Sequence, residues 1–139
     1  MHIAYAAGFF DGEGCVVIAK RIRKRQKTPE YVVVVTISQK VREPLEKLQE
    51  MFGGGIYENK SAKVWAWAIA SNPACAFLKK IRRHLWVKRQ QADLVIAFQR
   101  RFSKRPRVTP KELAYRDAVR AQLARLKRPW EDAPQLAPL

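Results

Sequence analysis

Hydrophobic and polar residues follow two different periods along this chain, and the change from one to the other divides it into helices and strands. Runs with apolar residues every three or four positions predict helices, whereas alternating or β-branched runs predict strands. The elements expected in order are helix 3–12, strands 15–24 and 31–39, helix 43–52, strands 56–59 and 63–70, and helices starting at 72, 87 and 110.

Proline, glycine and polar residues mark the ends of several of these elements. Asn72 before Pro73 is typical of a helix cap, and Thr109 with Glu112 forms a capping-box pattern that opens a last helix running to about residue 127. We therefore predict an α+β fold, with a four-stranded antiparallel sheet and helices on one face. The proline-rich end, 129–139, is expected to be loose or draped on the surface.

Alternation assigns the strand residues to two faces. The side chains expected to point to the helices are Tyr31, Val33, Val35, Ile37, Trp65 and Trp67, with Val16, Ile18 and Ile22 on the core side of the first strand. Trp65 and Trp67 could stack on bases, but core packing is favoured. The open face would carry Val17, Ala19, Arg21, Arg23, Glu30, Val32, Val34, Thr36, Ser38, Ile56, Glu58, Lys60, Val64, Ala66 and Ala68. A shift of one residue in a strand would invert its assignment.

Charge narrows the possible partners. The chain has 139 residues with 28 Lys and Arg against 12 Asp and Glu, a net charge of +16, which favours a polyanion. The apolar start, 1–10, lacks a basic leader and runs into acids, so we expect neither a signal peptide, an anchor nor a membrane partner. Cys15 and Cys75 are expected to be buried thiols, and the isolated His2 and His84 do not suggest zinc.

The first predicted helix combines a stripe of small residues with acids at its end. Ala4, Gly8 and Gly12 are spaced by four, and small residues at this spacing let two helix backbones approach closely. Tight packing of this stripe against the chain's own sheet is the alternative. Asp11 and Glu13 lie at the negative end of the helix macrodipole, so a cation such as a divalent metal should compensate them. A capping acid or a pair of surface acids is the alternative here.

The segment Ala6–Gly14, AAGFFDGEG, resembles the LAGLIDADG motif of homing endonucleases. Seven of its nine positions carry the usual residue or a common substitute, and Glu13 in place of Asp is frequent in that family, whereas Ala6 replaces the usual Leu. The predicted order of elements is similar to one LAGLIDADG repeat. The resemblance therefore implies a saddle-like sheet in an αββαββα core.

The resemblance continues downstream of the motif. Ser38–Lys40 is similar to the Gln-Lys pair that ends a strand in the family, and Leu85–Leu94 resembles its Lys-then-Gln-Ala segment. The match covers about 3–102. It implies an endonuclease domain over 1–103, with 104–139 forming a basic linker, a helix and a tail packed on the same domain.

Functional roles follow from this resemblance residue by residue. Glu13 would bind the catalytic metal, with the Gly12 carbonyl as a further ligand. Gln39 would order water near the scissile bond, and Lys88 would support the charge that develops at the phosphate. Asp11 matches a motif acid that is usually structural. The implied cofactor is Mg²⁺ or another divalent cation, such as Mn²⁺, or Ca²⁺ in a complex that does not cleave.

One motif per chain implies a homodimer, with Ala4, Gly8, Asp11 and Gly12 at the interface. Its activity would be a metal-dependent, site-specific double-strand break in a long pseudo-palindromic DNA target. Two Glu13 carboxylates would meet near the two-fold axis, where divalent ions relieve their repulsion. Such an enzyme would act at cellular DNA, in a prokaryotic or phage-infected cytoplasm or in an organelle.

The sheet would read double-stranded DNA in the major groove. The residues expected to contact DNA are Arg21, Arg23, Arg25, Lys27, Thr36, Ser38, Glu58 and Lys60. Valine and alanine in the middle of the open face suggest relaxed central specificity or readout through DNA bending. The run 100–107 has five cations and suits phosphate contacts or a solvated linker.

Three other interpretations stay open. A maturase of the same family would bind intron RNA, and a regulator on the same scaffold would bind DNA without cutting it. A ribosomal or nucleoid-type basic protein would explain the charge but not Glu13 between two glycines. The intact Glu13 favours the nuclease.

Overall fold

The computed structural model describes residues 1–131, which form an α+β fold built on one four-stranded antiparallel sheet. The elements are α1 (Ile3–Glu13), β1 (Gly14–Arg21), β2 (Glu30–Gln39), α2 (Glu43–Phe52), β3 (Gly55–Asn59), β4 (Val64–Ala70), α3 (Ser71–Ile81), η1 (Arg82–His84), α4 (Arg89–Ser103), α5 (Pro110–Leu126) and η2 (Pro129–Glu131). The strand order is β1-β2-β4-β3. Of the tail predicted to be loose or draped, 132–139 lie outside the described residues.

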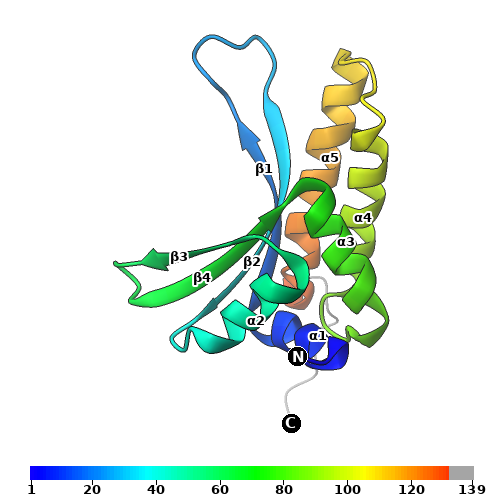
Figure 1. The fold of residues 1–139 in the computed structure, drawn as a ribbon. Helices are drawn as coiled ribbons and strands as arrows, with labels where there is room; N and C mark the ends of the chain where they lie inside the picture. Colours follow the sequence, from blue (N-terminus) through cyan, green and yellow to red (C-terminus); the bar gives the residue numbers. More distant parts are fainter. Residues whose placement is uncertain (132–139) are drawn as a thin grey trace.

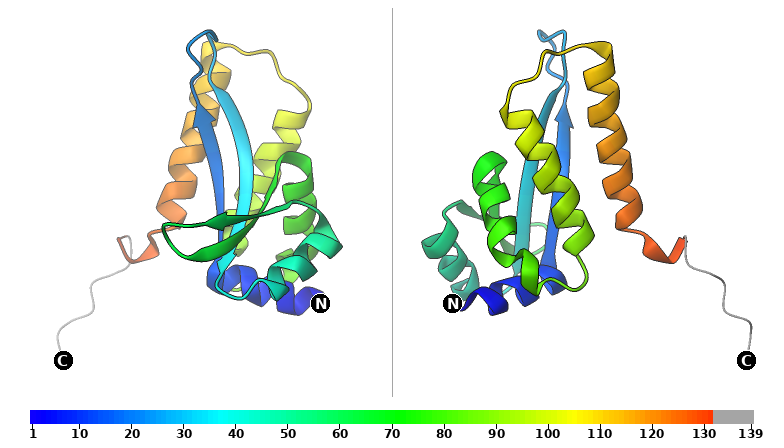
Figure 2. Two further views of the ribbon diagram at one scale, coloured as in Figure 1. Left: turned by 60° about the vertical axis from the view of Figure 1, so that its left-hand side comes forward. Right: turned by 90° about the vertical axis from the view of Figure 1, so that its right-hand side faces the viewer.

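The helices gather on one face of the sheet, as Figures 1 and 2 show. Alternate residues of the strands point into this layer, including Val33, Val35 and Ile37, which are fully buried. Phe77 of α3 lies at the centre, with its ring 5.2 Å from that of Trp67 and 5.9 Å from that of Phe10. The core therefore forms between the helix-facing side of the sheet and helices α1 to α5, and it confirms the predicted placement of Trp67.

Strand register confirms most of the predicted open face and corrects one strand. Val17 pairs with Val34 and Cys15 with Thr36, and directly paired residues lie on the same face. In β3, however, Tyr57 pairs with Ala66 and Glu58 pairs with Trp65. The assignment of Ile56 and Glu58 to the open face was therefore wrong by one residue, and Tyr57 takes that place.

The β1–β2 hairpin differs from the prediction at its tip. β1 ends at Arg21, three residues before the expected end, and Ile22 is 77% exposed instead of lying in the core. The connecting loop stands clear of the helices (Figure 1). The loop carries four cations, and all of them are exposed: Arg23, Lys24, Arg25 and Lys27. Because these charged side chains stay in water, the loop does not pack into a compact structure.

Two further expectations about single residues were wrong. Asn72 is not the cap of α3, which begins at Ser71; its side-chain oxygen instead accepts hydrogen bonds from Gln99 and Ser103 at 3.0 and 2.7 Å. Cys15 is exposed on the open face, whereas Cys75 is buried as expected. Both residues lie where their local sequence is apolar, so only the tertiary contacts distinguish them.

Helix α5 lies along the outer edge of β1 (Figure 2). Arg120 Nε donates to the Ile18 carbonyl oxygen at 2.8 Å, and Asp117 accepts from Lys20 Nζ at 2.9 Å and from the Tyr31 hydroxyl at 2.7 Å. An uncovered edge strand is a template for pairing with other chains, so α5 protects this edge.

Helices α4 and α5 are joined by a buried charge cluster. Glu112 is 4% exposed, and its carboxylate binds Arg101 at 2.6 Å and Arg116 at 3.3 Å. The Arg116 guanidinium also stacks on Phe102, 4.8 Å from the ring centre. Thr109 caps α5 as predicted, by accepting from the Glu112 N–H, but the Glu112 side chain is used by the arginines.

None of the helices within residues 1–131 is both long enough and apolar enough to cross a membrane.

Candidate active site

The junction between α1 and β1 positions the motif acids. α1 ends at Glu13 and β1 begins at Gly14, with no residue between them. A Cβ on Gly14 would lie 2.3 Å from the Phe10 ring and 2.6 Å from the Phe10 carbonyl oxygen, so only glycine fits here. This sharp turn leaves Glu13 exposed at the end of the helix.

Asp11 binds the segment that precedes α4. Its carboxylate accepts from the backbone N–H groups of Trp86 at 2.7 Å, Val87 at 3.3 Å and Lys88 at 3.0 Å. These donors supply the positive charge that a carboxylate at a helix C-terminus requires. The geometry fits the structural role that the resemblance implied for Asp11. Its expected place on the dimer interface stays a prediction.

Lys88 is held beside the motif by the same segment. Its Nζ donates to the Asp11 carbonyl oxygen at 2.5 Å and lies 5.8 Å from the centre of the Phe10 ring. The positive charge of Lys88 therefore lies against the last turn of α1, one residue from Gly12 and two from Glu13.

Gln39 lies at the same end of the sheet. Gly14 at the start of β1 pairs with Ile37, and Gln39 is two residues further along β2. Its Oε1 accepts from the Lys40 N–H at 2.8 Å. The fold thus brings Gly12, Glu13, Gln39 and Lys88, predicted from distant parts of the sequence, to one end of the sheet.

Glu13 makes no ion pair or hydrogen bond with the side chains of residues 1–131. The Gly12 carbonyl lies past the point where α1 could bond it, because a helical partner would be four residues ahead in β1. Both are hard oxygen donors, which suit Mg²⁺. Among residues 1–131, no three or more His, Cys, Asp or Glu side chains lie close enough together to hold a metal ion.

The small-residue stripe of α1 faces away from its own chain. The buried side of the helix consists of Ala6, Ala7 and Phe10, whereas Gly8 and Gly12 are exposed. A Cβ on either glycine would meet nothing within 4 Å. The alternative of tight packing against the chain's own sheet is therefore wrong.

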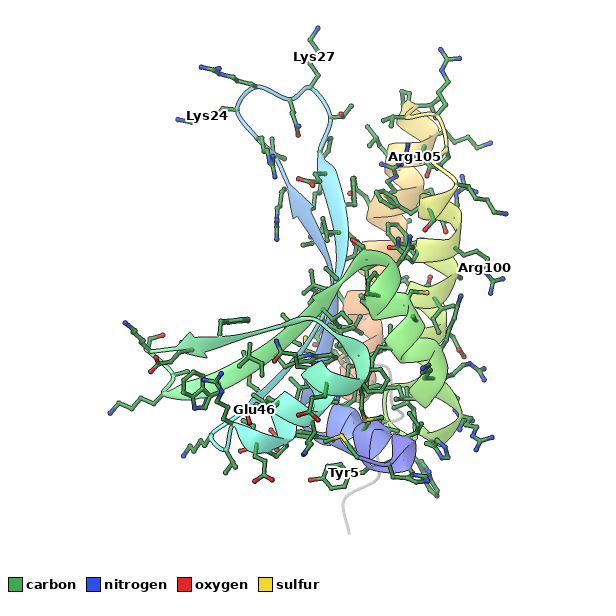
Figure 3. All side chains as sticks on the ribbon, in the orientation of Figure 1. Tyr5, Lys24, Lys27, Glu46, Arg100 and Arg105 are labelled. Atoms are coloured by element: carbon green, nitrogen blue, oxygen red, sulfur yellow. The ribbon has the colours of Figure 1, made fainter. Side chains whose placement is uncertain are left out.

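Cations predicted to contact DNA lie along the β1–β2 hairpin. Figure 3 shows Lys24 and Lys27 at its tip, with Arg105 at the same end of the molecule. Arg100, in contrast, projects from α4 on the side away from the sheet. Arg23 forms an exposed ion pair with Glu30 at 3.3 Å.

The remaining predicted contacts lie in three places. Thr36 and Ser38 lie on the open face, where they pair with Ala68 and Ala66. Arg21 lies there too, opposite Glu30, and Lys60 is in the β3–β4 turn. Glu58 lies on the other face.

Sequence reasoning missed two residues. Tyr57 is half exposed on the open face, and only the β3–β4 register reveals it. Gln91 is 6% exposed, and its Oε1 has no hydrogen-bond partner among the described residues. Together with Lys88 it lines a cavity of about 340 Å³ that also reaches Gly14. No periodicity distinguishes such a residue from a surface glutamine.

Solved structures of homing endonucleases share this fold. I-CvuI, in complex with the I-CreI target in the presence of magnesium, matches with a TM-score of 0.80 and 20% identity over 99% of this chain and 86% of its own. The archaeal intron-encoded homing endonuclease I-Vdi141I, complexed with DNA, matches with a TM-score of 0.79 and 20% identity over 89% and 82%. I-TnaI matches with a TM-score of 0.72 and 21% identity over 95% and 97%. At this identity the likeness defines the class of fold, that of the homing endonucleases.

The sequence places the chain within that class. The profile of the LAGLIDADG endonuclease family matches residues 6–85, more than half of the chain. The chain therefore belongs to the LAGLIDADG endonuclease family. No curated protein sequence matches it at a significant level.

Proposed function

We propose that this protein is a homing endonuclease that acts as a homodimer on double-stranded DNA, hydrolysing one phosphodiester in each strand with the help of a divalent cation. The observation that carries the proposal is the exposed Glu13 carboxylate, which has no protein partner within residues 1–131 yet lies two residues from the Lys88 contact.

The residues near the end of α1 would each have a separate role in the reaction. Glu13 and the Gly12 carbonyl would hold the cation, with the remaining ligands from DNA, water and the second copy. A bound divalent cation supplies Lewis-acid stabilisation of the attacking and leaving oxygens. Lys88 places a positive charge where the phosphate becomes more negative. Gln39 offers an amide that can orient the attacking water.

The open face suits the major groove. Its middle is apolar, with Val32, Val34 and Ala68 available to contact thymine methyl groups. Hydrogen-bonding groups lie toward its ends, at Arg21 and at Ser38. This distribution supports direct readout away from the centre of the sheet and indirect readout over its middle.

The test of this function is selection of cut sites from a randomised plasmid library. We expect the protein, incubated with Mg²⁺, to make double-strand breaks at one family of related, roughly palindromic sites. Specific binding without cutting in Mg²⁺ or Mn²⁺ would favour the non-cleaving regulator. Selective retention of a structured intron RNA over DNA would favour the maturase.

The α1 stripe gives a prediction about assembly. In the proposed dimer the two α1 helices pack through Gly8, so Gly8→Leu should separate them and shift the protein to monomer. Gly55→Leu is the matched control, because a Cβ on Gly55 also meets nothing within 4 Å but lies in β3. Light scattering without DNA measures both, and an unchanged dimer in Gly8→Leu would count against this interface.

The hairpin gives a prediction about specificity. Arg21→Ala should relax base preference at one position in each half-site and weaken specific binding by about 1–3 kcal/mol, the usual effect of losing a bidentate base contact. Arg100→Ala, on the far side of α4, should leave base preference unchanged. Binding measured against single-base variants of the selected site checks both. Equal effects of the two variants would contradict readout by Arg21.

A further inference from the structure

Most of the net positive charge of this chain lies in its helical layer. Residues 79–111, from the last turn of α3 to the first turn of α5, contain 12 Lys and Arg and a single acid, Asp93. The open face of the sheet, by contrast, is apolar in its middle. The helices cover the other side of the sheet (Figure 2), so a duplex on the open face does not reach the outer side of this layer. The charge there needs a cause of its own.

Three of these cations are aligned along α4. Arg89, Arg100 and Lys104 are separated by 11 and 4 residues, close to whole numbers of helical turns, so they lie on one side of the helix. All three are exposed. Arg100 projects away from the sheet in Figure 3, so the three residues face outward. Together they form the α4 stripe.

The side chains of the α4 stripe form no ion pair within residues 1–131. The nearby acid Asp93 is already bound to Arg82. Arg89 is the first residue of α4, where a cation opposes the helix macrodipole. Like charges held along one helix also repel each other and lower stability. A polyanionic partner therefore explains the stripe better than a solvated surface does.

Duplex DNA fits the α4 stripe better than unpaired RNA does. From residue 89 to residue 104 the helix spans about 22 Å, and one DNA strand carries about six phosphates over that length. Recognition of unpaired bases uses exposed aromatic rings, whereas α4 has no exposed large hydrophobic side chain. Lysine and arginine instead suit phosphate contacts, which hold DNA without reading its sequence.

We propose that the α4 stripe holds a second segment of duplex DNA, through its phosphates, while the open face of the sheet holds a first segment. The inference goes beyond the cleavage reaction and rests on the proposed function only for the DNA on the open face. With two such faces, the protein can bind the next segment before it releases the first. It can then search many non-specific sites without diffusing freely between segments.

The experiment measures capture of a second duplex by an existing complex. A target duplex no longer than the selected site is fixed to a surface and loaded with protein in Ca²⁺, unbound protein is washed away, and a labelled duplex of unrelated sequence is added. We expect wild type to retain the labelled duplex at low salt. Arg100→Gln with Lys104→Gln should weaken this retention about tenfold or more and lower its salt slope by about two, because two phosphate contacts are lost.

Lys24→Gln with Lys27→Gln is the matched control, because it makes the same change of charge at the tip of the β1–β2 hairpin. It should weaken binding of the target duplex and leave retention of the second duplex per bound protein unchanged. The α4 double variant should show the reverse. Far-UV circular dichroism checks that both double variants fold. Equal loss of retention in the two would reduce the effect to overall charge and overturn the inference.

Release from the first duplex gives a second readout. If the protein passes directly between segments, the rate at which wild type leaves a labelled target should rise with the concentration of free duplex. The α4 double variant should lose most of this dependence. The same dependence in both proteins would exclude the α4 stripe as the second DNA surface.

The outcomes separate this inference from the proposed function. Wild type that binds its target but captures no second duplex would overturn the inference alone. A structured RNA that displaces the labelled duplex at lower concentration than unlabelled duplex DNA does would also overturn it, because the stripe would then be an RNA surface. Wild type that binds no duplex on either face would overturn the proposed function as well.

Discussion

Glu13→Gln should abolish DNA cleavage and leave DNA binding intact. Glutamine keeps the size of the side chain but removes the negative charge that would hold a divalent cation. Metal stabilisation of a phosphoryl transition state contributes several kcal/mol, so we expect cleavage to fall about a thousandfold. Binding should persist because Glu13 is exposed and contacts no side chain of residues 1–131. Single-turnover cleavage and gel-shift titration in Ca²⁺ measure the two properties.

Glu58→Gln is the matched control for this variant. Glu58 is an exposed glutamate on β3, on the face opposite the proposed DNA contacts, and the same charge change there should leave cleavage as in wild type. Cleavage by Glu13→Gln at the wild-type rate would remove Glu13 from the active site. An equal loss in both variants would indicate a general charge effect.

Glu112→Ala should destabilise the fold more than substitution of the other ion-paired acids. The change leaves Arg116, whose side chain is only 7% exposed, without its counter-ion. Breaking a buried pair in this way costs about 3 kcal/mol or more, a large part of a typical domain's stability. Urea unfolding at one fixed protein concentration measures the change.

Two further variants test whether the loss of stability in Glu112→Ala comes from the buried charge left without a partner. The double substitution Glu112→Leu with Arg116→Met should recover much of the loss, because apolar groups then replace the whole buried pair. Asp93→Ala removes the partner of the exposed Arg82 and should cost less than about 1 kcal/mol. If Glu112→Ala is no worse than Asp93→Ala, the buried cluster does not hold α5 in place.

The pH dependence of stability should follow from this cluster and from Asp117, which binds Lys20 and Tyr31. The hydrogen bond from Arg101 lowers the pKa of Glu112, and hydrogen bonds from Tyr31 and Lys20 lower the pKa of Asp117. Both carboxylates therefore stabilise the folded state above their ordinary pKa of about 4, and this contribution is lost as the pH falls through the lower folded value. The wild type should lose stability over this acidic range more steeply than Glu112→Ala.

Local patterns were sufficient to predict the order of elements. α2 has the expected bounds, because Pro44 near its start and Gly53 after its end are local signals. The sequence also predicted which side chains of β1 and β2 point to which face of the sheet. Long alternating runs leave few ways to assign residues to the two faces. β3 has only five residues, and its face depends on pairing with β4, which no local pattern specifies.

The site was predicted less completely than the fold. Glu13 and Gly12 are visible from the motif, and Lys88 from the resemblance downstream. The bonds from Asp11 to residues 86–88 join positions 75 to 77 residues apart, so periodicity could not show them. α4 begins at Arg89, two residues later than expected.

The direct passage from α1 into β1 has a mechanical consequence. Because no linker residue separates the helix from the strand, Glu13 and β1, the first strand proposed to contact DNA, should move together as one rigid unit. Substitutions at the outer ends of the hairpins should therefore change which DNA sequence is bound. The distance along the DNA between that sequence and the cleaved phosphodiester should stay the same.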